Sequence, residues 1–592
     1  MTANMPAFDP AALRAKYDLE RDKRLRADGN DQYVHLEEHS THFLDDPYTP
    51  REERAPVTRD VEVVILGGGF GGLLTAGRLS EAGIDDFLVI EKGGDFGGTW
   101  YWNRYPGAAC DVESYVYLPL LEETGYMPSE KYAGGEEIYA YSRKIGEKYG
   151  LYDKALFQTL IDAFRWDESS GKWIVETDRG DDIKARYVIV CAGHYQNPKL
   201  PGIPGVLDFK GHSFHTSRWD YDYTGGNQEG GLDKLKDKTV AIIGTGATAV
   251  QCIPHLGRSA KQLYVFQRTP SSVDLRGDRP TDAAWFNALE PGWQKARMDN
   301  FIALTSGIPV ERDMIDDSWT KPMFRALSEG AGKPIEQFYQ IMQMNDFSIM
   351  EGVRARVAET VADVETAEAL KPWYNRLCKR PCFHDDYLPT FNRPNVTLVD
   401  TEGRGVERIT ERGLVVDGNE YPVDCIVFAT GFDLAAYSGL AVPVYGRDGQ
   451  SLADKWREGA TTLHGMHVHG FPNLFIVGTT QSAWGANFPH MMEEQARHIA
   501  YVLGELKRRG ATRVEVTEAA EAEWVARHEA ESARLTAIWA ECTPSYFNNE
   551  GQPSPAISRN GGFGSGVIPF VQILESWRAD GQLAGLELQK AV

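Results

Sequence analysis

The stretch Val61-Glu-Val-Val-Ile-Leu-Gly67-Gly-Gly69-Phe-Gly-Gly72 decides the fold of the first part of the chain. Residues 61–66 form a short apolar run, which is typical of a buried strand. The glycines follow at once with the spacing G-x-G-x-x-G. The first permits a tight turn, the second lets a pyrophosphate approach the backbone, and the third lets helix and strand pack closely. The stretch therefore predicts a dinucleotide site at the N-terminus of a helix.

An acidic residue completes this first unit. Residues 87–90 are apolar and predict the next strand, and Glu91 ends it, 19 residues after Gly72. A carboxylate at this place accepts hydrogen bonds from ribose hydroxyls. The alternative is a glycine-rich turn in an ordinary parallel sheet, but the strand and the acid at this spacing favour a nucleotide site.

A second unit repeats the pattern with one difference. Residues 239–243 predict a strand, and Gly244-Thr-Gly246-Ala-Thr-Ala249 follows it; alanine is permitted at the third position. The following strand, residues 263–267, ends at Arg268, 19 residues after Ala249. Arginine can bind a ribose 2′-phosphate through two hydrogen bonds, whereas a carboxylate would repel it. This site is therefore expected to prefer NADPH to NADH; the alternative is an exposed surface arginine.

Two dinucleotide sites of different selectivity imply electron transfer between two cofactors. The site that ends in glutamate suits FAD, and the site that ends in arginine suits NADPH. Residues 188–193 and 426–431 are two further apolar strands that end in glycine. In flavoproteins with two dinucleotides, the chain crosses between the nucleotide domains at such segments.

Composition limits the partners of the protein. The 592 residues include 62 Lys and Arg against 85 Asp and Glu, a net charge of −23. This charge excludes a broad nucleic-acid footprint and disfavours anionic membranes. No apolar stretch of membrane-spanning length and no signal peptide is present, so we expect a cytoplasmic protein that binds neither nucleic acid nor membrane.

The seven cysteines are an odd number and are mostly scattered, which predicts reduced intracellular thiols. Cys378, Cys382 and His384 lie close enough in the sequence to suggest a metal site. No fourth ligand and no Cys-x-x-Cys pair lies nearby, so we expect no metal.

Two longer motifs resemble those of a known family. The pattern Phe209-x-Gly211-x-x-x-His215-x-x-x-Trp219-Asp220 resembles the fingerprint of the Baeyer–Villiger monooxygenases at every fixed position. A second family motif fits Gly98-x-Trp100-x-x-x-x-Tyr105-Pro-Gly107-x-x-x-Asp111. The resemblance covers nearly the whole chain from about residue 61. Residues 20–24 and 28–32 are similar to the N-terminal arm of the family members that oxidise large-ring ketones.

The resemblance implies a fold and an activity. The expected fold class is α/β, with two Rossmann-like dinucleotide-binding domains and a helical insertion. We place an N-terminal arm at 1–60, the FAD domain at 61–195 and 430–592, the NADPH domain at 196–275 and 379–429, and the helical insert at 276–378. NADPH would reduce FAD, and one oxygen atom of O2 would enter a bulky or large-ring ketone to give an ester or lactone. We expect a monomer or weak homo-oligomer.

The family match also assigns roles in the active site. Arg380 matches the active-site arginine, a cation that would stabilise the peroxide anion and the negatively charged adduct. Asp111 matches the acid that positions this arginine. Without the match, Arg380 would be interpreted as part of a structural salt bridge. His215 could act as a base, but we favour a structural role, in which it holds the segment that joins the two domains. Trp219 is interpreted as a hinge anchor.

Two loops match segments near the substrate. Residues 481–487 match the family loop that lines the substrate pocket, and residues 545–549 match a mobile loop that covers the nicotinamide. Tyr546 stands where tryptophan is common, and Ala109 stands where arginine is common, which leaves the pocket shape open. The residues expected to line the substrate pocket are Ala483, Trp484 and Tyr546. The residues expected to bind cofactors are Gly67, Gly69, Phe70, Gly72, Glu91, Lys92, Gly98, Thr99, Trp100, Tyr105, Asp111, Gly244, Thr245, Gly246, Ala247, Thr248, Arg268, Thr269, Lys379 and Asn487.

Three other functions compete with this interpretation. A flavin monooxygenase acting on amines or thioethers would share both cofactor sites, but it usually lacks the Trp-Asp ending of the fingerprint. A disulfide-reducing flavoenzyme needs a redox-active cysteine pair near the first helix, and no cysteine precedes Cys110. A non-catalytic redox sensor would bind the dinucleotides without oxidising a ketone.

Overall fold

The first glycine turn lies at the edge of a large sheet in the computed structural model, which describes residues 8–34, 43–193, 195, 197–433, 440 and 442–590. Strand β2 (Thr58–Leu66) runs into the turn, and helix α3 (Phe70–Glu81) leaves it. The next strand, β3 (Phe87–Ile90), pairs with β2 in parallel and ends one residue before Glu91. The predicted strand, turn, helix and strand are therefore all confirmed.

The first sheet has eight strands in the order β19-β5-β6-β7-β2-β3-β4, with β20 paired to β7. β2, β3, β4, β7 and β20 run parallel, so their carboxyl ends meet at one edge. β6 is antiparallel to both β5 and β7. The bounds of the added strands are β4 Ala155–Leu156, β5 Ile161–Asp167, β6 Lys172–Thr177, β7 Asp182–Val190, β19 Val444–Tyr445 and β20 Leu474–Ile476.

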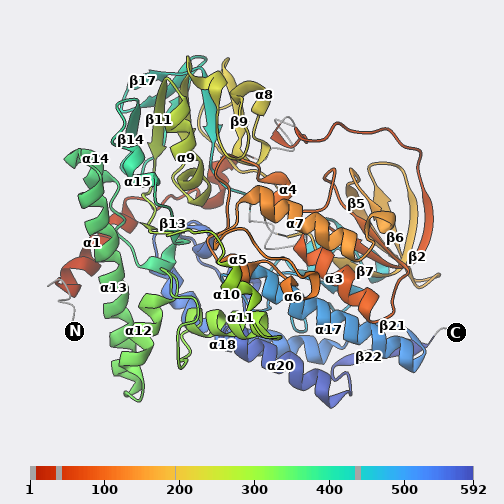
Figure 1. Ribbon diagram of the computed structural model, residues 1–592. Helices are drawn as coiled ribbons and strands as arrows, with labels where there is room; N and C mark the ends of the chain where they lie inside the picture. The colour runs from red at the N-terminus through yellow and green to blue at the C-terminus, as the bar shows by residue number, and fades with distance from the viewer. Residues whose placement is uncertain are drawn as a thin grey trace.

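The second glycine turn belongs to a five-stranded parallel sheet, seen at the top of Figure 1, with the order β14-β11-β10-β18-β9. β10 (Thr239–Ile243) leads into the turn and α9 (Ala247–Ser259) follows it. β11 (Gln262–Gln267) ends beside Arg268, as predicted. The remaining strands are β9 His212–His215, β14 Val396–Asp400 and β18 Cys425–Phe428.

Helices fill the space beside the two sheets. The segment expected to be helical folds as α10 (Ala283–Asn287), α11 (Trp293–Thr305), α12 (Lys321–Gly330), α13 (Ile335–Thr360) and α14 (Val364–Ala369). The C-terminal part supplies α17 (Phe488–Arg509), α18 (Glu518–Ala540) and α20 (Val567–Asp580), which lie along the base of the molecule in Figure 1. The domain boundaries drawn from the sequence stay predictions.

The N-terminal helix α1 (Pro10–Asp22) begins with a side-chain cap. The Asp9 carboxylate accepts hydrogen bonds from the backbone N–H groups of Ala11 and Ala12, and Pro10 is the first helical residue. The helix packs on α13, where the Phe347 ring lies 5.9 Å from the Tyr17 ring. The arm is thus attached to the helical insert (Figure 1).

One expectation about the cysteines is wrong. Cys378 and Cys542 form a disulfide across 164 residues of sequence, whereas the other five cysteines are free and buried. The disulfide joins the end of the helical insert to the residues that follow α18. Sequence spacing gave no sign of this pair, because the two cysteines meet only through tertiary packing. A disulfide-bonded Cys378 also has no thiolate to offer a metal, and the described residues hold no cluster of three His, Cys, Asp or Glu suited to one.

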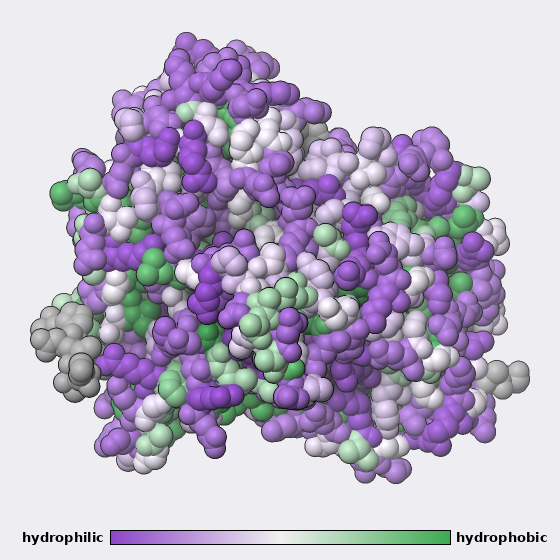
Figure 2. All heavy atoms as spheres, viewed as in Figure 1, coloured by the Kyte–Doolittle hydropathy of each residue, from purple (hydrophilic) through white to green (hydrophobic). Residues whose placement is uncertain are grey.

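The face in Figure 2 is largely hydrophilic, and its hydrophobic residues form separate small patches. Among the residues that the structure describes, no helix combines the length and the apolar character needed to cross a membrane.

The close packing of the first glycine turn can be tested with two glycine substitutions. A Cβ atom at Gly72 would lie 1.8 Å from the carbonyl oxygen of Gly67, whereas a Cβ at Gly504, inside α17, meets nothing within 4 Å. We expect Gly72→Ala to destabilise the protein and prevent it from retaining flavin. Gly504→Ala should keep the flavin and stabilise the fold by up to about 1 kcal/mol. Flavin absorbance after gel filtration and urea unfolding measure both effects; a yellow, stable Gly72→Ala protein would contradict the packing argument.

Candidate active site

One cavity of about 1380 Å³ contains the features singled out by the sequence. It lies at the carboxyl ends of parallel strands of both sheets, the place at which open α/β sheets bind ligands. The residues predicted from the sequence that line it are Gly67, Gly69, Phe70, Glu91, Lys92, Gly98, Thr99, Trp100, Tyr105, Asp111, Gly244, Thr245, Gly246, Ala247, Thr248, Arg268, Thr269, Lys379, Arg380, Trp484 and Tyr546.

Three predicted residues lie behind the cavity wall instead. Gly72 packs under the first turn, as a helix–strand contact requires. Asn487 is buried and its side chain donates a hydrogen bond to the carbonyl oxygen of Val116. Ala483 is fully buried in the core, and the lining of the cavity begins one residue later, at Trp484. The loop of residues 481–487 therefore contributes less of its length to the pocket than the sequence suggested.

The first turn is held by Glu91. One carboxylate oxygen of Glu91 accepts a hydrogen bond from the Gly68 N–H at 2.6 Å, and the other accepts one from the Gly93 N–H at 2.7 Å. Burial raises the pKa of Glu91, and these two N–H groups oppose that effect. Gly67, with a φ of 104°, approaches the Cys191 carbonyl so closely that a Cβ would lie 2.5 Å from it. The carboxylate and the open turn together fit the ribose and pyrophosphate of FAD.

The second glycine turn, residues 244–249, leaves more free space beside its backbone than the first turn does. Gly244 has a φ of 111° and packs on the Ala429 carbonyl, whereas a Cβ at Gly246 would meet nothing within 4 Å. The Thr245 hydroxyl donates to the Thr269 carbonyl at 2.7 Å, which ties the turn to the end of β11. Arg268 lies there with 31% of its side chain exposed. The open space at Gly246 and the nearby arginine fit the pyrophosphate and the 2′-phosphate of NADPH.

The most charged feature of the cavity is a buried carboxylate between two arginines. Asp111, only 3% exposed, receives Arg276 on one oxygen at 3.1 Å and Arg380 on the other at 3.4 Å. Burial lowers the pKa of Arg380, but Asp111, helped by Tyr195, Tyr546 and Cys110, outweighs that effect, so that the pKa is raised above its ordinary value. Sequence reasoning missed Arg276, because it lies 165 residues from Asp111 and in neither family motif.

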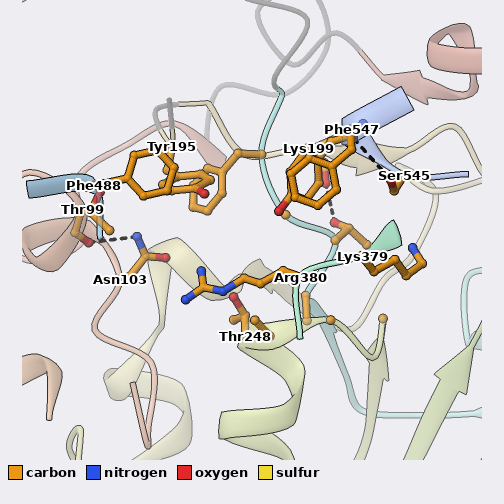
Figure 3. A pocket seen from close by; sticks show the side chains of 18 of the residues that line it. Thr99, Asn103, Tyr195, Lys199, Thr248, Lys379, Arg380, Phe488, Ser545 and Phe547 are labelled. Carbon is orange, nitrogen blue, oxygen red and sulfur yellow. Dashed lines mark hydrogen bonds between the residues drawn. The ribbon is translucent and has the colours of Figure 1, made fainter. Parts of the chain in front are cut away.

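The two arginines differ in what they face. Arg276 is 10% exposed and lies behind the cavity wall, whereas 42% of the Arg380 side chain is exposed. Figure 3 shows the Arg380 guanidinium projecting into the cavity, between Tyr195 on one side and Thr248 on the other. A purely structural salt bridge needs no such opening. A permanent cation held in this way can stabilise negative charge on a ligand oxygen.

Two residues of the fingerprint, His215 and Trp219, lie inside the protein. His215 is fully buried, and its Nδ1 accepts a hydrogen bond from the Ser217 N–H at 3.2 Å. Burial lowers the pKa of His215 to about 3, so the ring is neutral at physiological pH. Trp219 is 1% exposed, and its indole N–H donates to the Thr224 hydroxyl at 3.0 Å. Neither side chain lines the cavity, which supports a structural role for both residues.

Four aromatic side chains line part of the cavity and are called the aromatic wall here: Trp484, Phe488, Trp539 and Phe547. Trp484 packs against Phe547 with ring centres 5.0 Å apart, and Phe547 stacks on Trp539 of α18 at 5.6 Å. Phe488, at the start of α17, adds a further ring beside Trp484. The sequence indicated Trp484 and Tyr546, whose ring lies 4.2 Å from that of Phe547. It did not indicate Phe547, Trp539 or Phe488, because these rings arrive from a loop and two helices. Flat apolar surfaces of this kind suit a ligand with fused or large rings.

The segment of residues 545–549, expected to be a mobile loop that covers the nicotinamide, packs against residues 378–380. The Ser545 hydroxyl donates to the Cys378 carbonyl at 3.0 Å, and the Lys379 ammonium donates to the Pro544 carbonyl at 3.2 Å. A capping box between Ser545 and Asn548 shapes the short helix η9 (Tyr546–Asn548). Together with the Cys378–Cys542 disulfide, these contacts fix the segment beside Lys379 and Arg380.

Comparisons with known proteins agree with this geometry. Neopentalenolactone D synthase of Streptomyces avermitilis is 51% identical over 595 residues, covering 98% of this chain and 100% of that protein. A Baeyer–Villiger monooxygenase of Streptomyces coelicolor is 47% identical over 582 residues, 96% of each chain. The chain belongs to the Baeyer–Villiger monooxygenases. It is an NADPH-dependent flavoenzyme, and FAD and NADPH are its cofactors.

Solved structures and a family profile extend the match. A polycyclic ketone monooxygenase from the thermophilic fungus Thermothelomyces thermophila has a TM-score of 0.92 and 40% identity, over 98% of this chain and 99% of that one. A steroid monooxygenase bound to NADP has a TM-score of 0.73 and 29% identity, over 90% and 100%. The profile described as pyridine nucleotide-disulphide oxidoreductase matches residues 64–280, which include both glycine turns of this Baeyer–Villiger monooxygenase.

The disulfide gives a direct prediction. Unfolded protein without reductant should expose five thiols to a thiol reagent, and seven after reduction. A Cys378→Ser/Cys542→Ser protein should be about 2–5 kcal/mol less stable, because an unfolded chain without the cross-link has more conformational freedom. Hydrogen exchange in residues 543–550 should also accelerate. A count of seven thiols in the oxidised protein would contradict the disulfide.

The charge of Lys379 predicts a pH dependence. Burial lowers the pKa of Lys379 to about 8, an effect that Glu550 partly opposes. Its ammonium therefore loses its proton as the pH rises through 8, and one cation disappears from the Arg268 side of the cavity. We expect the dissociation constant of NADP⁺ to rise up to about tenfold between pH 7 and pH 9.

Two controls accompany this titration. The dissociation constant of NAD⁺, which has no 2′-phosphate, should stay nearly constant over the same range. Lys379→Arg, whose cation does not titrate there, should abolish the pH dependence for NADP⁺. A profile that is unchanged in Lys379→Arg would assign the pH dependence to another group.

Proposed function

We propose that this enzyme inserts one oxygen atom of O2 beside the carbonyl carbon of a bulky polycyclic ketone and releases a lactone. The observation that carries the proposal is the shared cavity, which is lined by the Arg380 guanidinium, by the aromatic wall and by both nucleotide turns. The name of the fungal polycyclic ketone monooxygenase points to the same class of substrate, and the name of neopentalenolactone D synthase points to a lactone product.

In this proposal Arg380 is the catalytic cation. Reduced FAD, when bound, supplies the activation of O2. Arg380 stabilises the negative charge that develops on oxygen, an electrostatic contribution that is often the largest in catalysis. Because Arg276 and Arg380 share a single carboxylate, the group of three carries a net charge of +1, and Asp111 positions Arg380 without cancelling its charge.

The aromatic wall orients the ketone. Trp484, Trp539 and Phe547 offer ring faces and edges to an apolar ring system, and they exclude water from the carbonyl group. In the proposal, the carbonyl oxygen of the ketone held by these rings interacts with the Arg380 cation. The predictions of a cytoplasmic location and of a monomer or weak homo-oligomer stay predictions.

A panel of substrates tests the reaction and its class. Purified protein with NADPH and O2 is offered a small-ring ketone, a large-ring ketone, a fused polycyclic ketone and a thioether, and the products are separated by chromatography. We expect the fused ketone to give a lactone and to accelerate NADPH consumption most. Formation of a sulfoxide without any ester would instead support oxidation at sulfur or nitrogen.

The role of Arg380 is tested by the ratio of lactone formed to NADPH consumed. Arg380→Ala should still pass electrons from NADPH to FAD, but its lactone yield should fall about a hundredfold to a thousandfold, as for the loss of other oxyanion donors. Arg404→Ala is the matched control, because Arg404 lines the same cavity and pairs with Asp417 at 2.9 Å. Lactone formation at the normal ratio in Arg380→Ala would rule out the assigned role.

A further inference from the structure

The phosphate side of the cavity already contains an anion of the protein itself. The Glu550 carboxylate, in a residue only 6% exposed, lies 3.3 Å from the Arg268 guanidinium and 3.7 Å from the Lys199 ammonium. Lys379 adds a third positive charge that acts on the same carboxylate. All four residues line the cavity. Three cations therefore surround one carboxylate, which leaves two positive charges in surplus.

The backbone turns Glu550 inward at this point. Asn549 and Glu550 both have positive φ values, 54° and 55°, in a region that residues other than glycine seldom adopt. Two contacts with the N-terminal arm hold this conformation: Asn30 donates to the Asn549 side chain, and Gln552 donates to the Ala27 carbonyl at 2.9 Å. The left-handed turn therefore serves to bring the carboxylate to the cations, and the arm supports it.

Glu550 is ionised in this position. Burial raises its pKa, but Arg268, Lys199 and Lys379 together bring the pKa below its ordinary value. An ionised carboxylate offers the same kind of acceptor to arginine and lysine as a phosphate oxygen does. Arg268 has a second acceptor as well, the Gln32 side-chain oxygen at 2.6 Å. Both terminal nitrogens of its guanidinium thus donate hydrogen bonds to groups of the protein.

We propose that Glu550 is an internal competitor of the 2′-phosphate of NADPH: its carboxylate pairs with Arg268 and Lys199, and the incoming phosphate displaces it. The inference rests on the assignment of Arg268 to the 2′-phosphate. Glu550, which lies in none of the sequence motifs, would then help to determine the preference for NADPH over NADH. It also couples cofactor binding to the loop of residues 543–552, because the residue that is displaced belongs to that loop.

A charge-removing variant tests the competition through binding alone. In the FAD-bound protein, Glu550→Gln should lower the dissociation constant of NADP⁺ about threefold to tenfold, because a buried competing charge is removed. The dissociation constant of NAD⁺ should change less than about twofold. Glu541→Gln removes the same charge from an exposed position outside the cavity lining and should alter neither constant. Weaker NADP⁺ binding in Glu550→Gln, or an equal change for both nucleotides, would overturn the proposal.

Hydrogen exchange gives a second test, which is made first on the unmodified protein. Addition of saturating NADP⁺ should change the exchange of residues 543–552, and saturating NAD⁺ should not. The same exchange pattern with both nucleotides would also overturn the proposal. Glu550→Gln should lose the difference between the nucleotides.

A third variant separates this inference from the assignment on which it rests. Arg268→Ala should weaken NADP⁺ binding and leave NAD⁺ binding nearly unchanged. If it does not, the 2′-phosphate assignment itself fails. If Arg268→Ala behaves as expected and Glu550→Gln does not tighten NADP⁺ binding, only the competition is wrong.

Discussion

The buried ion group of Asp111, Arg276 and Arg380 is the interaction on which the active site depends. Its carboxylate belongs to the loop after the first nucleotide unit, Arg276 precedes α10, and Arg380 follows α14. The Trp319 indole N–H, between α11 and α12, donates to the Asp111 backbone carbonyl at 2.8 Å. Three regions that are distant in sequence thus meet at one residue. A carboxylate this deeply buried needs paired cations, so the position of Arg380 is linked to the assembly of the whole cavity.

The two consecutive cations Lys379 and Arg380 divide the cavity into two electrostatic regions. Lys379 has an extended backbone, with φ of −133° and ψ of 160°. Successive side chains of an extended segment point in opposite directions, and Figure 3 shows Lys379 and Arg380 pointing apart. One cation faces the phosphate side with Arg268 and Lys199, and the other faces the reacting side with Asp111. The protein has a net charge of −23, yet these cations gather at the two places where the cofactor phosphate and the negatively charged oxygen are expected.

Much of the fold could be predicted because local patterns determine it. The strands β2, β3, β10 and β11, and the turns that follow β2 and β10, are visible as short apolar runs followed by glycines. Arg268 was predictable because its place is set by counting along one nucleotide unit. Arg380 and Asp111 needed a family motif, since nothing in their immediate sequence shows that they meet.

Other parts of the site depend on tertiary contacts that no local pattern shows. Arg276, Glu550 and the Cys378–Cys542 disulfide lie far from their partners in sequence. Phe547 and Trp539 form the aromatic wall only because a loop and α18 reach the same cavity. Matching the loop as a whole predicts Ala483 in the pocket, although its side chain packs in the core. The sequence thus predicts the cofactors well and the substrate wall poorly.

Isotope labelling tests the central claim most directly, namely that this cavity transfers one atom of O2 to a ketone. The purified enzyme is given NADPH, a fused polycyclic ketone and ¹⁸O2 in unlabelled water, and the lactone is analysed by mass spectrometry. The account predicts one ¹⁸O atom, located in the ring oxygen of the lactone. A lactone whose ring oxygen comes from water, or NADPH consumption without any labelled ester, would contradict it.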